Sequence, residues 1–190
     1  MESALIVIDF INDIVHPQGK IPSCAVQVNQ NKVIENANQA IAWARQKGHL
    51  LIFVKVGFQS SYQDVPVWSP MFGKAGEIGA LDLSGWGTAF HDALDVQPSD
   101  LVVVKPRVNP FHNTSLDSIL RANRISSVYL CGVSTSWAIQ SATRDAHDRD
   151  YKVNIICDAC AAHSAEEHQT SLNMLERIAA LWQSGTLEDT

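Results

Sequence analysis

No apolar run in the sequence approaches the ~20 residues that a membrane-spanning helix requires, so we expect no contact with a membrane. Runs of basic residues are also missing. Lys and Arg number 14 against 20 Asp and Glu, for a formal net charge of −6, and a nucleic-acid partner is therefore not expected. The N-terminus carries an acidic residue and leads directly into a strand-like segment, unlike a signal peptide, which favours a cytoplasmic protein.

Cysteine is scarce, with 4 residues in all: Cys24, Cys131, Cys157 and Cys160. A free thiol inside an apolar strand-like run, such as Cys131, usually acts as a small core residue. Cys157 and Cys160 form a CxxC pair followed by His163, a pattern found in redox and zinc sites. A redox CxxC normally opens a helix, however, whereas this pair closes a strand, so we favour a structural role. We expect neither a metal ion nor a cofactor.

Short apolar runs alternate with amphipathic segments along the chain. The first kind is typical of strands buried on both faces, and apolar residues spaced three or four apart indicate helices. This pattern predicts strands over 4–10, 50–56, 100–105, 128–131, 152–157 and 178–182, and helices over 26–47, 114–123, 135–148 and 164–177. The alternation predicts a single α/β domain over 1–190, a three-layer doubly wound (Rossmann-like) sandwich. Its six-stranded parallel sheet would have helices on both faces.

The segment from 57 to 98 contains many Gly, Pro and Trp residues and little periodicity. We expect a loop there, interrupted by a short helix over 88–94. Loops of this length in compact domains usually form pocket walls or lids. Substrate specificity is therefore expected to lie largely in this segment, together with a neighbouring subunit if the protein is an oligomer.

One predicted strand turns directly into a helix near residue 132. Gly132 allows a sharp turn, and Ser134 and Thr135 are residues that commonly start helices. Such a junction directs backbone N–H groups and the positive end of the helix dipole at the edge of the sheet. We expect the N–H groups of Ser134 and Ala138 to form an oxyanion hole, although Ala138 stands where a nucleophile would sit. The alternative is an ordinary helix start.

Two charged residues follow buried strands at the same edge of the predicted sheet. Asp9 ends the first strand and Lys105 ends the third. Functional sites of such sheets lie at the carboxyl ends of the strands, and no GxGxxG of a dinucleotide-binding protein follows the first strand. We expect the two side chains within ~3 to 4 Å of each other, with Asp9 as general acid or base. Lys105 would either orient Asp9 or bind developing negative charge. The alternatives are structural, with Asp9 capping a turn and Lys105 lying on the surface.

Three blocks of sequence together resemble the isochorismatase-like, or cysteine hydrolase, superfamily. They are 5–9 with Asn12 and Asp13; 101–107 with Phe111, Thr114 and Leu116; and 132–135 with 143–146 and Asp158. The resemblance spans nearly the whole chain. It implies a six-stranded parallel sheet, a cis peptide bond between Val133 and Ser134, and a homo-oligomer (dimer or tetramer). It also implies a site built from an acid, a lysine and a cysteine, which many members use to hydrolyse amides.

The sequence departs from this family in its site. The acid and the lysine align with Asp9 and Lys105, but the cysteine aligns with Ala138. A glutamine that often follows the acid by two positions is replaced by Ile11, and the metal-binding histidine pattern of nicotinamidases is missing. Isochorismatases proper are similar to this chain in lacking the cysteine. They cleave a vinyl ether and need no covalent intermediate.

Further residues are candidates for the wall of a substrate pocket: Ile11, Trp68, Phe111, Thr135 and Trp137. The aromatic ones could enclose a planar ring, although aromatic residues are more often plain core. Thr135 could face the same cleft as Ala138. Its unactivated hydroxyl would be a poor substitute for the missing nucleophile.

These features favour an isochorismatase-type hydrolase that acts on a small, anionic or carbonyl-bearing metabolite. Asp9 would transfer protons, Lys105 and the oxyanion hole would hold charge, and water would be the nucleophile. One alternative is a cysteine amidohydrolase whose nucleophile is replaced by Ala138. Another is a non-catalytic protein that binds a small molecule, against which the acid–lysine pair argues because a plain binding pocket does not need one.

Overall fold

Six parallel strands form one sheet in the computed structural model, which describes residues 2–189. The strands are β1 (Ser3–Ile8), β2 (Leu50–Val56), β3 (Leu101–Lys105), β4 (Ser127–Val133), β5 (Lys152–Ala161) and β6 (Ala180–Trp182), in the spatial order β3-β2-β1-β4-β5-β6. The helices are α1 (Asn12–Val15), α2 (Ala25–Gln30), α3 (Val33–Lys47), α4 (Ala75–Ile78), α5 (Leu116–Ala122), α6 (Gln140–Asp148) and α7 (Ala165–Leu175). The chain builds outward from β1 to β3 and then returns to β4, which is the doubly wound topology that the sequence predicts.

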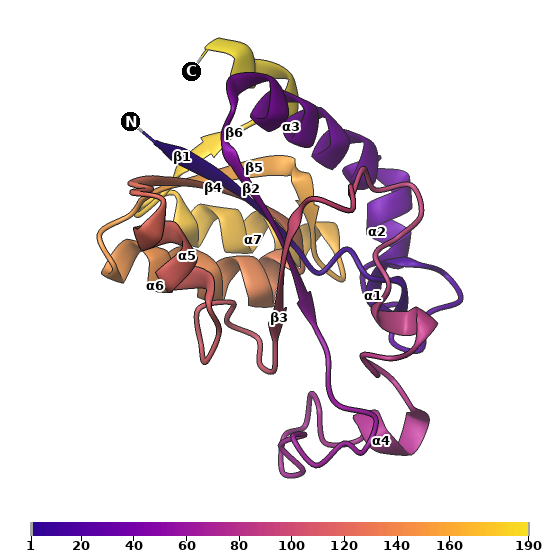
Figure 1. The fold of residues 1–190 in the computed structure, drawn as a ribbon. Coiled ribbons are helices and arrows are strands. Elements are labelled where there is room, and N and C mark those ends of the chain that lie inside the picture. The colour runs from indigo at the N-terminus through magenta and orange to yellow at the C-terminus, as the bar shows by residue number, and fades with distance from the viewer. Residues whose placement is uncertain (1, 190) are drawn as a thin grey trace.

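Helices cover both faces of the sheet (Figure 1). Helix α3 packs against β1, β2 and β5, whereas α6 and α7 lie on the opposite face and also contact β5. Strand β1 is central, and its residues Leu5 to Ile8 are completely buried because both of its faces are covered. The edge strand β3 instead leaves Leu101, Val102 and Val104 partly exposed.

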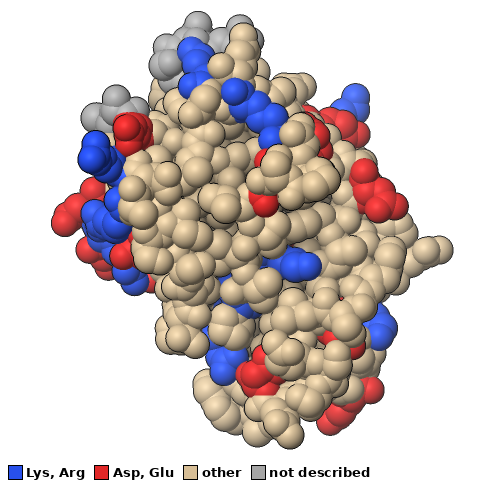
Figure 2. Space-filling view, in the orientation of Figure 1, with Lys and Arg blue, Asp and Glu red and all other residues tan. Residues whose placement is uncertain are grey.

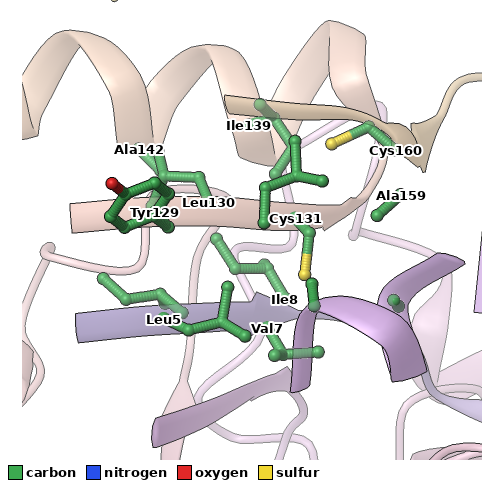
Figure 3. Close-up of a cluster of buried hydrophobic side chains, with 14 of the residues drawn as sticks. Leu5, Val7, Ile8, Tyr129, Leu130, Cys131, Ile139, Ala142, Ala159 and Cys160 are labelled. Atoms are coloured by element: carbon green, nitrogen blue, oxygen red, sulfur yellow. The ribbon is translucent and has the colours of Figure 1, made fainter. Parts of the chain in front are cut away.

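The helical segment that follows β4 is fixed to the sheet by apolar contacts. Figure 3 shows Ile139 and Ala142 on the helix side of β4, near Leu130, while Cys131 points to the other side of the strand. All four side chains are completely buried. Burying one isoleucine side chain stabilises a fold by about 1.5 to 3 kcal/mol, so these contacts hold the start of this helical segment in place.

The predicted helix over 26–47 is two helices, α2 and α3. They are separated at Asn31 and Lys32, and Lys32 has a left-handed backbone with φ of 53°. Left-handed backbone interrupts the helical hydrogen-bond ladder, and Asn has low helix propensity. The spacing of apolar residues continues across the break, which is why periodicity alone predicts one helix.

The segment 57–98 begins at the carboxyl end of β2. Its part around α4 lies at the end of the molecule opposite both chain termini in Figure 1, and its last residues return to α3, where Asn38 bonds to Ala93 and Asp95. The segment contains α4 and a 3₁₀ turn over 86–88, but the predicted helix over 88–94 is absent. Phe90 forms an antiparallel bridge with Ile11, and the N–H of His91 donates to the carbonyl oxygen of Phe10. These pairings use the backbone groups that a helix would need.

Side-chain hydroxyl groups accept hydrogen bonds from backbone N–H groups at the starts of two helices. The N–H of Glu167 donates to the side chain of Ser164 over 3.1 Å, as expected for the N-cap of α7. The N–H of Leu116 donates to the Thr114 hydroxyl over 3.2 Å at the start of α5. Both helices are slightly shorter than the spacing of apolar residues predicts. Helix α5 covers 116–122 where 114–123 is predicted, and α7 covers 165–175 where 164–177 is predicted.

Surface features bear on the predicted partners. Within residues 2–189, no helix combines the length and the apolar character needed to cross a membrane. On the face drawn in Figure 2, Lys and Arg lie among Asp and Glu mainly around the rim and form no continuous basic surface. The predictions of no nucleic-acid partner, a cytoplasmic location and an oligomer are not tested by these observations.

The close approach of the Gly132 backbone to the neighbouring strand β1 can be tested by substitution. Its φ is +132°, and a Cβ atom at this position would collide with the backbone of Ile8 on the neighbouring strand. We expect Gly132→Ala to lower the free energy of unfolding by about 3 kcal/mol or more, because neither backbone can yield. Urea denaturation measures the change. Gly185→Ala is the matched control, since no atom lies within 4 Å of its added Cβ, and should change stability by less than about 0.5 kcal/mol.

Candidate active site

Asp9 and Lys105 meet above the end of β2. Asp9 directly follows β1 with a left-handed backbone (φ 59°), and Lys105 is the last residue of β3. The Nζ of Lys105 lies 2.7 Å from the Oδ2 of Asp9. Because β2 lies between the two strands, the pair spans it, and the N–H of Val56 donates to the Oδ1 of Asp9 over 2.8 Å. The predicted distance between the two side chains is confirmed.

Both members of this pair are buried, with relative exposures of 3% for Asp9 and 1% for Lys105. Lys105 is therefore not a surface lysine. Burial raises the pKa of the Asp9 carboxyl above its usual value, while the ammonium group of Lys105 and the N–H of Val56 oppose that rise. Asp9 is thus a carboxyl group with an elevated proton affinity and a fixed orientation.

The ammonium group of Lys105 has no donor to spare. Besides its contact with Asp9, it donates to the carbonyl oxygens of Arg107 over 3.2 Å and Val108 over 3.0 Å. A lysine ammonium has three N–H donors, and these contacts use all of them. A carboxylate offers about four lone-pair positions, so Asp9 retains acceptor capacity after binding Lys105 and Val56.

The strand-to-helix junction adjoins this pair. The peptide bond between Val133 and Ser134 is cis, as the family resemblance implies. The predicted helix over 135–148 begins as a π-helical turn over Thr135–Ile139 and continues as α6. The N–H groups of Trp137 and Ile139 both donate to the carbonyl oxygen of Ser134. Ser134 and Ala138, the residues predicted to form an oxyanion hole, both line the cavity beside the junction.

A cavity of about 280 Å³ connects the ion pair to the junction. Its polar lining residues are Asp9, Lys105, Ser23 and Ser134. The other lining residues are apolar: Ile14, Ile21, Val56, Met71, Phe72, Leu81, Val108, Val133, Trp137 and Ala138. Three of these come from the segment 57–98, which therefore forms part of the pocket wall as expected. The site is a small, mainly apolar pocket with a few polar groups at one end.

Asp13 attaches the wall segment to the rest of the fold. Its side chain is buried, and it accepts hydrogen bonds from the N–H of Leu81 over 2.7 Å and of Lys20 over 3.1 Å. Asn12 adds a bond from its side-chain amide to the carbonyl oxygen of Trp86 over 3.0 Å. Helix α1 therefore fixes two points of the segment 57–98 beside the cavity.

Four of the five predicted pocket residues do not line this cavity. Ile11 is completely buried beside Phe58 and Leu81, because its backbone pairs with the wall segment. Thr135 is also completely buried, and its hydroxyl lies 2.8 Å from the Nδ1 of His168, behind the junction. Both side chains are packed in the interior, so neither lines this cavity.

The aromatic candidates divide in a similar way. Phe111 belongs to the main core, where its ring stacks near that of Tyr151. Trp68 is 83% exposed and borders a separate hollow that includes Arg107. Trp137 does line the cavity and is 57% exposed at its edge. Residue type alone does not distinguish these three positions.

The cysteines lie outside the cavity wall. All four are buried, and burial raises the pKa of each thiol, to about 11 for Cys24 and Cys157 and further for Cys131 and Cys160. Such thiols are poor nucleophiles at neutral pH. Among residues 2–189, no three His, Cys, Asp or Glu side chains come together in a group that could hold a metal ion.

Several lining residues were not identified from the sequence. Val56 and Val133 end strands at the same edge as Asp9, so strand-end position was a usable signal for them. Ser23 and Ile21 lie in the loop between α1 and α2, where nothing in the local pattern indicates a pocket. Loop residues of this kind are placed by tertiary contacts and not by their own spacing.

The chain is similar to known proteins along nearly its whole length. A family model described as the isochorismatase domain matches residues 3–185. Ureidoacrylate amidohydrolase RutB of Acinetobacter baylyi is 30% identical over 199 residues, covering 97% of this chain and 81% of that protein. The uncharacterized isochorismatase family protein YecD of Escherichia coli O157:H7 is 30% identical, covering 93% of this chain and 89% of that protein.

Solved structures share the fold. An isochorismatase family protein from Desulfovibrio vulgaris superposes with a TM-score of 0.88 at 21% identity, covering 98% of this chain and 96% of that one. A cysteine hydrolase from Pseudomonas syringae gives a TM-score of 0.86 at 23% identity, covering 98% and 90%. The match of the family model and the relatives at 30% identity show that this chain belongs to the isochorismatase family, within the isochorismatase and cysteine hydrolase superfamily.

Proposed function

We propose that the protein is a hydrolase that adds water to a small carbonyl-bearing metabolite without forming a covalent intermediate. The observation that carries this proposal is the buried pair of Asp9 and Lys105 at one end of a cavity whose other wall includes Ala138. The pair supplies a proton acceptor, and the junction at Ala138 supplies backbone N–H groups. The named activity of the amidohydrolase relatives agrees with this class of reaction.

Asp9 is proposed as the general acid and base. Its carboxylate accepts a proton from water as the water oxygen attacks the substrate carbonyl, and the protonated Asp9 then returns that proton to the leaving group. The elevated pKa of Asp9 supports this role, because a proton-transfer group works best when its pKa approaches the working pH. Its free acceptor capacity allows a water molecule to bind beside Lys105.

Lys105 is proposed as a positioning residue. With all its donors used by Asp9, Arg107 and Val108, it holds the carboxylate in place and favours its ionised form. The developing negative charge on the substrate oxygen would be held by the backbone N–H groups of Ser134 and Ala138. The count of Lys105 N–H donors supports this division of roles.

Ala138 explains why water is proposed as the nucleophile. Its methyl group cannot attack a carbonyl, Thr135 is buried away from the cavity, and the native thiols lie outside the wall. The alternative function, a non-catalytic protein that binds a small molecule, would use the same pocket. It is less well supported, since a plain binding pocket does not need a buried acid–lysine pair whose carboxyl group has a raised pKa.

We expect Asp9→Asn to lower turnover by ~100-fold or more, because an amide cannot accept the proton from water. Hydrolysis of p-nitrophenyl acetate, ureidoacrylate and primary amides by the parent identifies a substrate, and the variant is then assayed with it. Asp148→Asn is the control, since the Asp148 side chain is 81% exposed and remote from the cavity wall. Equal turnover in Asp9→Asn and the parent would exclude Asp9 as the proton-transfer group.

The pH profile tests the positioning role of Lys105. The ionised form of Asp9 is the base, so turnover falls as the pH decreases through its raised pKa. Lys105→Met removes the charge that opposes this rise, and the acid limb of the profile should move to higher pH by about 1 to 3 units. Lys152→Met, at an exposed lysine, should leave the limb in place. If the acid limb of the Lys105→Met profile lies at the same pH as in the parent, Lys105 does not influence the pKa of Asp9 and the positioning role is contradicted.

Ala138→Cys tests whether this position is the nucleophile site. A thiol beside Asp9, Lys105 and a helix start should have a lowered pKa and react with iodoacetamide at pH 6 at least ~10 times faster than an ordinary thiol of pKa ~8.5. Ala122→Cys, at the exposed end of α5, provides the ordinary thiol. The native cysteines should stay unlabelled. An equal labelling rate in the two variants would place the reactive centre elsewhere.

A further inference from the structure

A second hollow of about 390 Å³ adjoins the cavity beside the ion pair. Phe72 and Val108 line both spaces, and three segments of the chain supply residues to each: 66–72, 105–109 and 134–141. On the last of these, Trp137 lines the cavity and Ser141 lines the hollow, about one helical turn apart. The hollow therefore continues the cavity along the same three walls.

Arg107 is the cationic residue of this hollow, and its guanidinium is held at one end only. The Nη1 atom donates to the carbonyl oxygens of Asp64 and Pro106. Among residues 2–189, the Nε and Nη2 atoms of Arg107 have no hydrogen-bond partner. Their N–H groups run parallel along one edge of the guanidinium, and this edge matches the two oxygens of a carboxylate. Arg107 is thus anchored by one nitrogen, with its carboxylate-binding edge unused.

No acidic side chain of the protein occupies that edge. Arg107 forms no ion pair with any residue from 2 to 189, and neither Asp nor Glu lines the hollow. The carboxylate of Asp64 accepts from the N–H of Gln59, and that of Asp145, which binds Asn109 of the hollow, is paired with an arginine. Three arginines outside the hollow each pair with an aspartate: Arg45, Arg121 and Arg149.

Trp68 provides an apolar surface next to this unpaired cation. Its side chain is 83% exposed at the edge of the hollow, where Phe72 also contributes. A tryptophan ring carries a large apolar area, and covering it with a ligand is favourable. Arg107 and Trp68 together offer a charged group and an apolar face to one bound molecule.

We propose that this hollow binds a carboxylate group of the substrate through the Nε and Nη2 of Arg107. The reacting carbonyl lies in the cavity beside Asp9, and the part of the substrate between the two groups crosses Phe72 and Val108 and contacts Trp68. The inference rests on the proposed function only for the position of the reacting carbonyl. It assigns the substrate to the carboxylic acids that carry a second, hydrolysable carbonyl group at the far end of the molecule.

Monoamides of dicarboxylic acids provide the test. Malonamate, succinamate and glutaramate have an amide at one end, a carboxylate at the other and a carbon chain of increasing length between them. Their uncharged counterparts are malonamide, succinamide and glutaramide. Isothermal titration at pH 7 compares their binding to the full-length protein. We expect at least one monoamide to bind ~10-fold or more tightly than its diamide, because a bidentate bond between arginine and a carboxylate is stronger than a neutral hydrogen bond.

Substitution of Arg107 should remove this preference. Arg107→Gln lacks the charge and the two-pronged edge, so monoamide affinity should fall by ~10-fold while diamide affinity changes by less than about twofold. Arg107→Lys keeps the charge without the edge and should retain about a threefold preference, which also provides a reading if Arg107→Gln does not fold. Arg177→Gln is the matched control at an exposed arginine after α7 and should leave the preference unchanged.

Trp68→Ala tests the apolar part of the hollow. Loss of the ring should weaken binding of the monoamide and of the diamide by a similar factor of about threefold, because this contact does not depend on charge. Val67→Ala is the control, at a neighbouring side chain that is 82% exposed and does not line the hollow. Unchanged affinity in Trp68→Ala would contradict the contact with Trp68.

The inference is overturned if no monoamide binds, if each binds no more tightly than its diamide, or if Arg107→Gln keeps the preference. An equal loss in Arg177→Gln would show a general effect of net charge and would also contradict it. Binding requires no turnover, so the two proposals fail separately. Unchanged turnover in Asp9→Asn would refute the proposed function, and a preference that depends on Arg107 would still support this inference.

Discussion

The buried ion pair between Asp9 and Lys105 organises the functional edge of the sheet. The two residues end strands that are not neighbours, and the pair is completed across the end of β2 by the N–H of Val56. Removing one partner of a buried pair typically costs about 3 to 5 kcal/mol, because the other charge is left without compensation. The relative positions of β1, β2 and β3 and the chemistry of the cavity therefore depend on the same contact.

The sequence predicted this contact from limited information. Asp9 and Lys105 follow short apolar runs, and parallel strands bring their carboxyl ends to one edge. The strand that lies between the two residues could not be inferred, because strand order is not encoded in periodicity. The family resemblance supplied the cis peptide bond between Val133 and Ser134, which the structure contains. The π-helical first turn over 135–139 had no counterpart in the prediction, since Ser and Thr residues start several kinds of helix.

The pocket wall was harder to predict than the charged centre. Trp137 lines the cavity, whereas Phe111 is core and Trp68 is exposed, although the three residues looked equivalent in the sequence. Tertiary packing decides among such positions, and aromatic side chains suit all three environments. Ser23 shows the opposite case, in which a residue in a short loop reaches the cavity with no local signal. Charged strand ends are informative because burying them is unfavourable without a purpose, while apolar residues can be buried almost anywhere.

The bonds from Asn12 and Asp13 to the wall segment also affect how molecules enter and leave. Lifting this segment would break hydrogen bonds to a buried carboxylate, so a hinged opening of the whole segment is strongly disfavoured. The side chains of Met71 and Trp137 are about half exposed at the cavity edge and are free of such bonds to the fold. Rotamer changes of these two exposed side chains break no such hydrogen bonds, and exposed side chains change rotamer on a picosecond-to-nanosecond timescale. The edge of the pocket can therefore change shape at these two side chains while the backbone of the wall segment stays fixed.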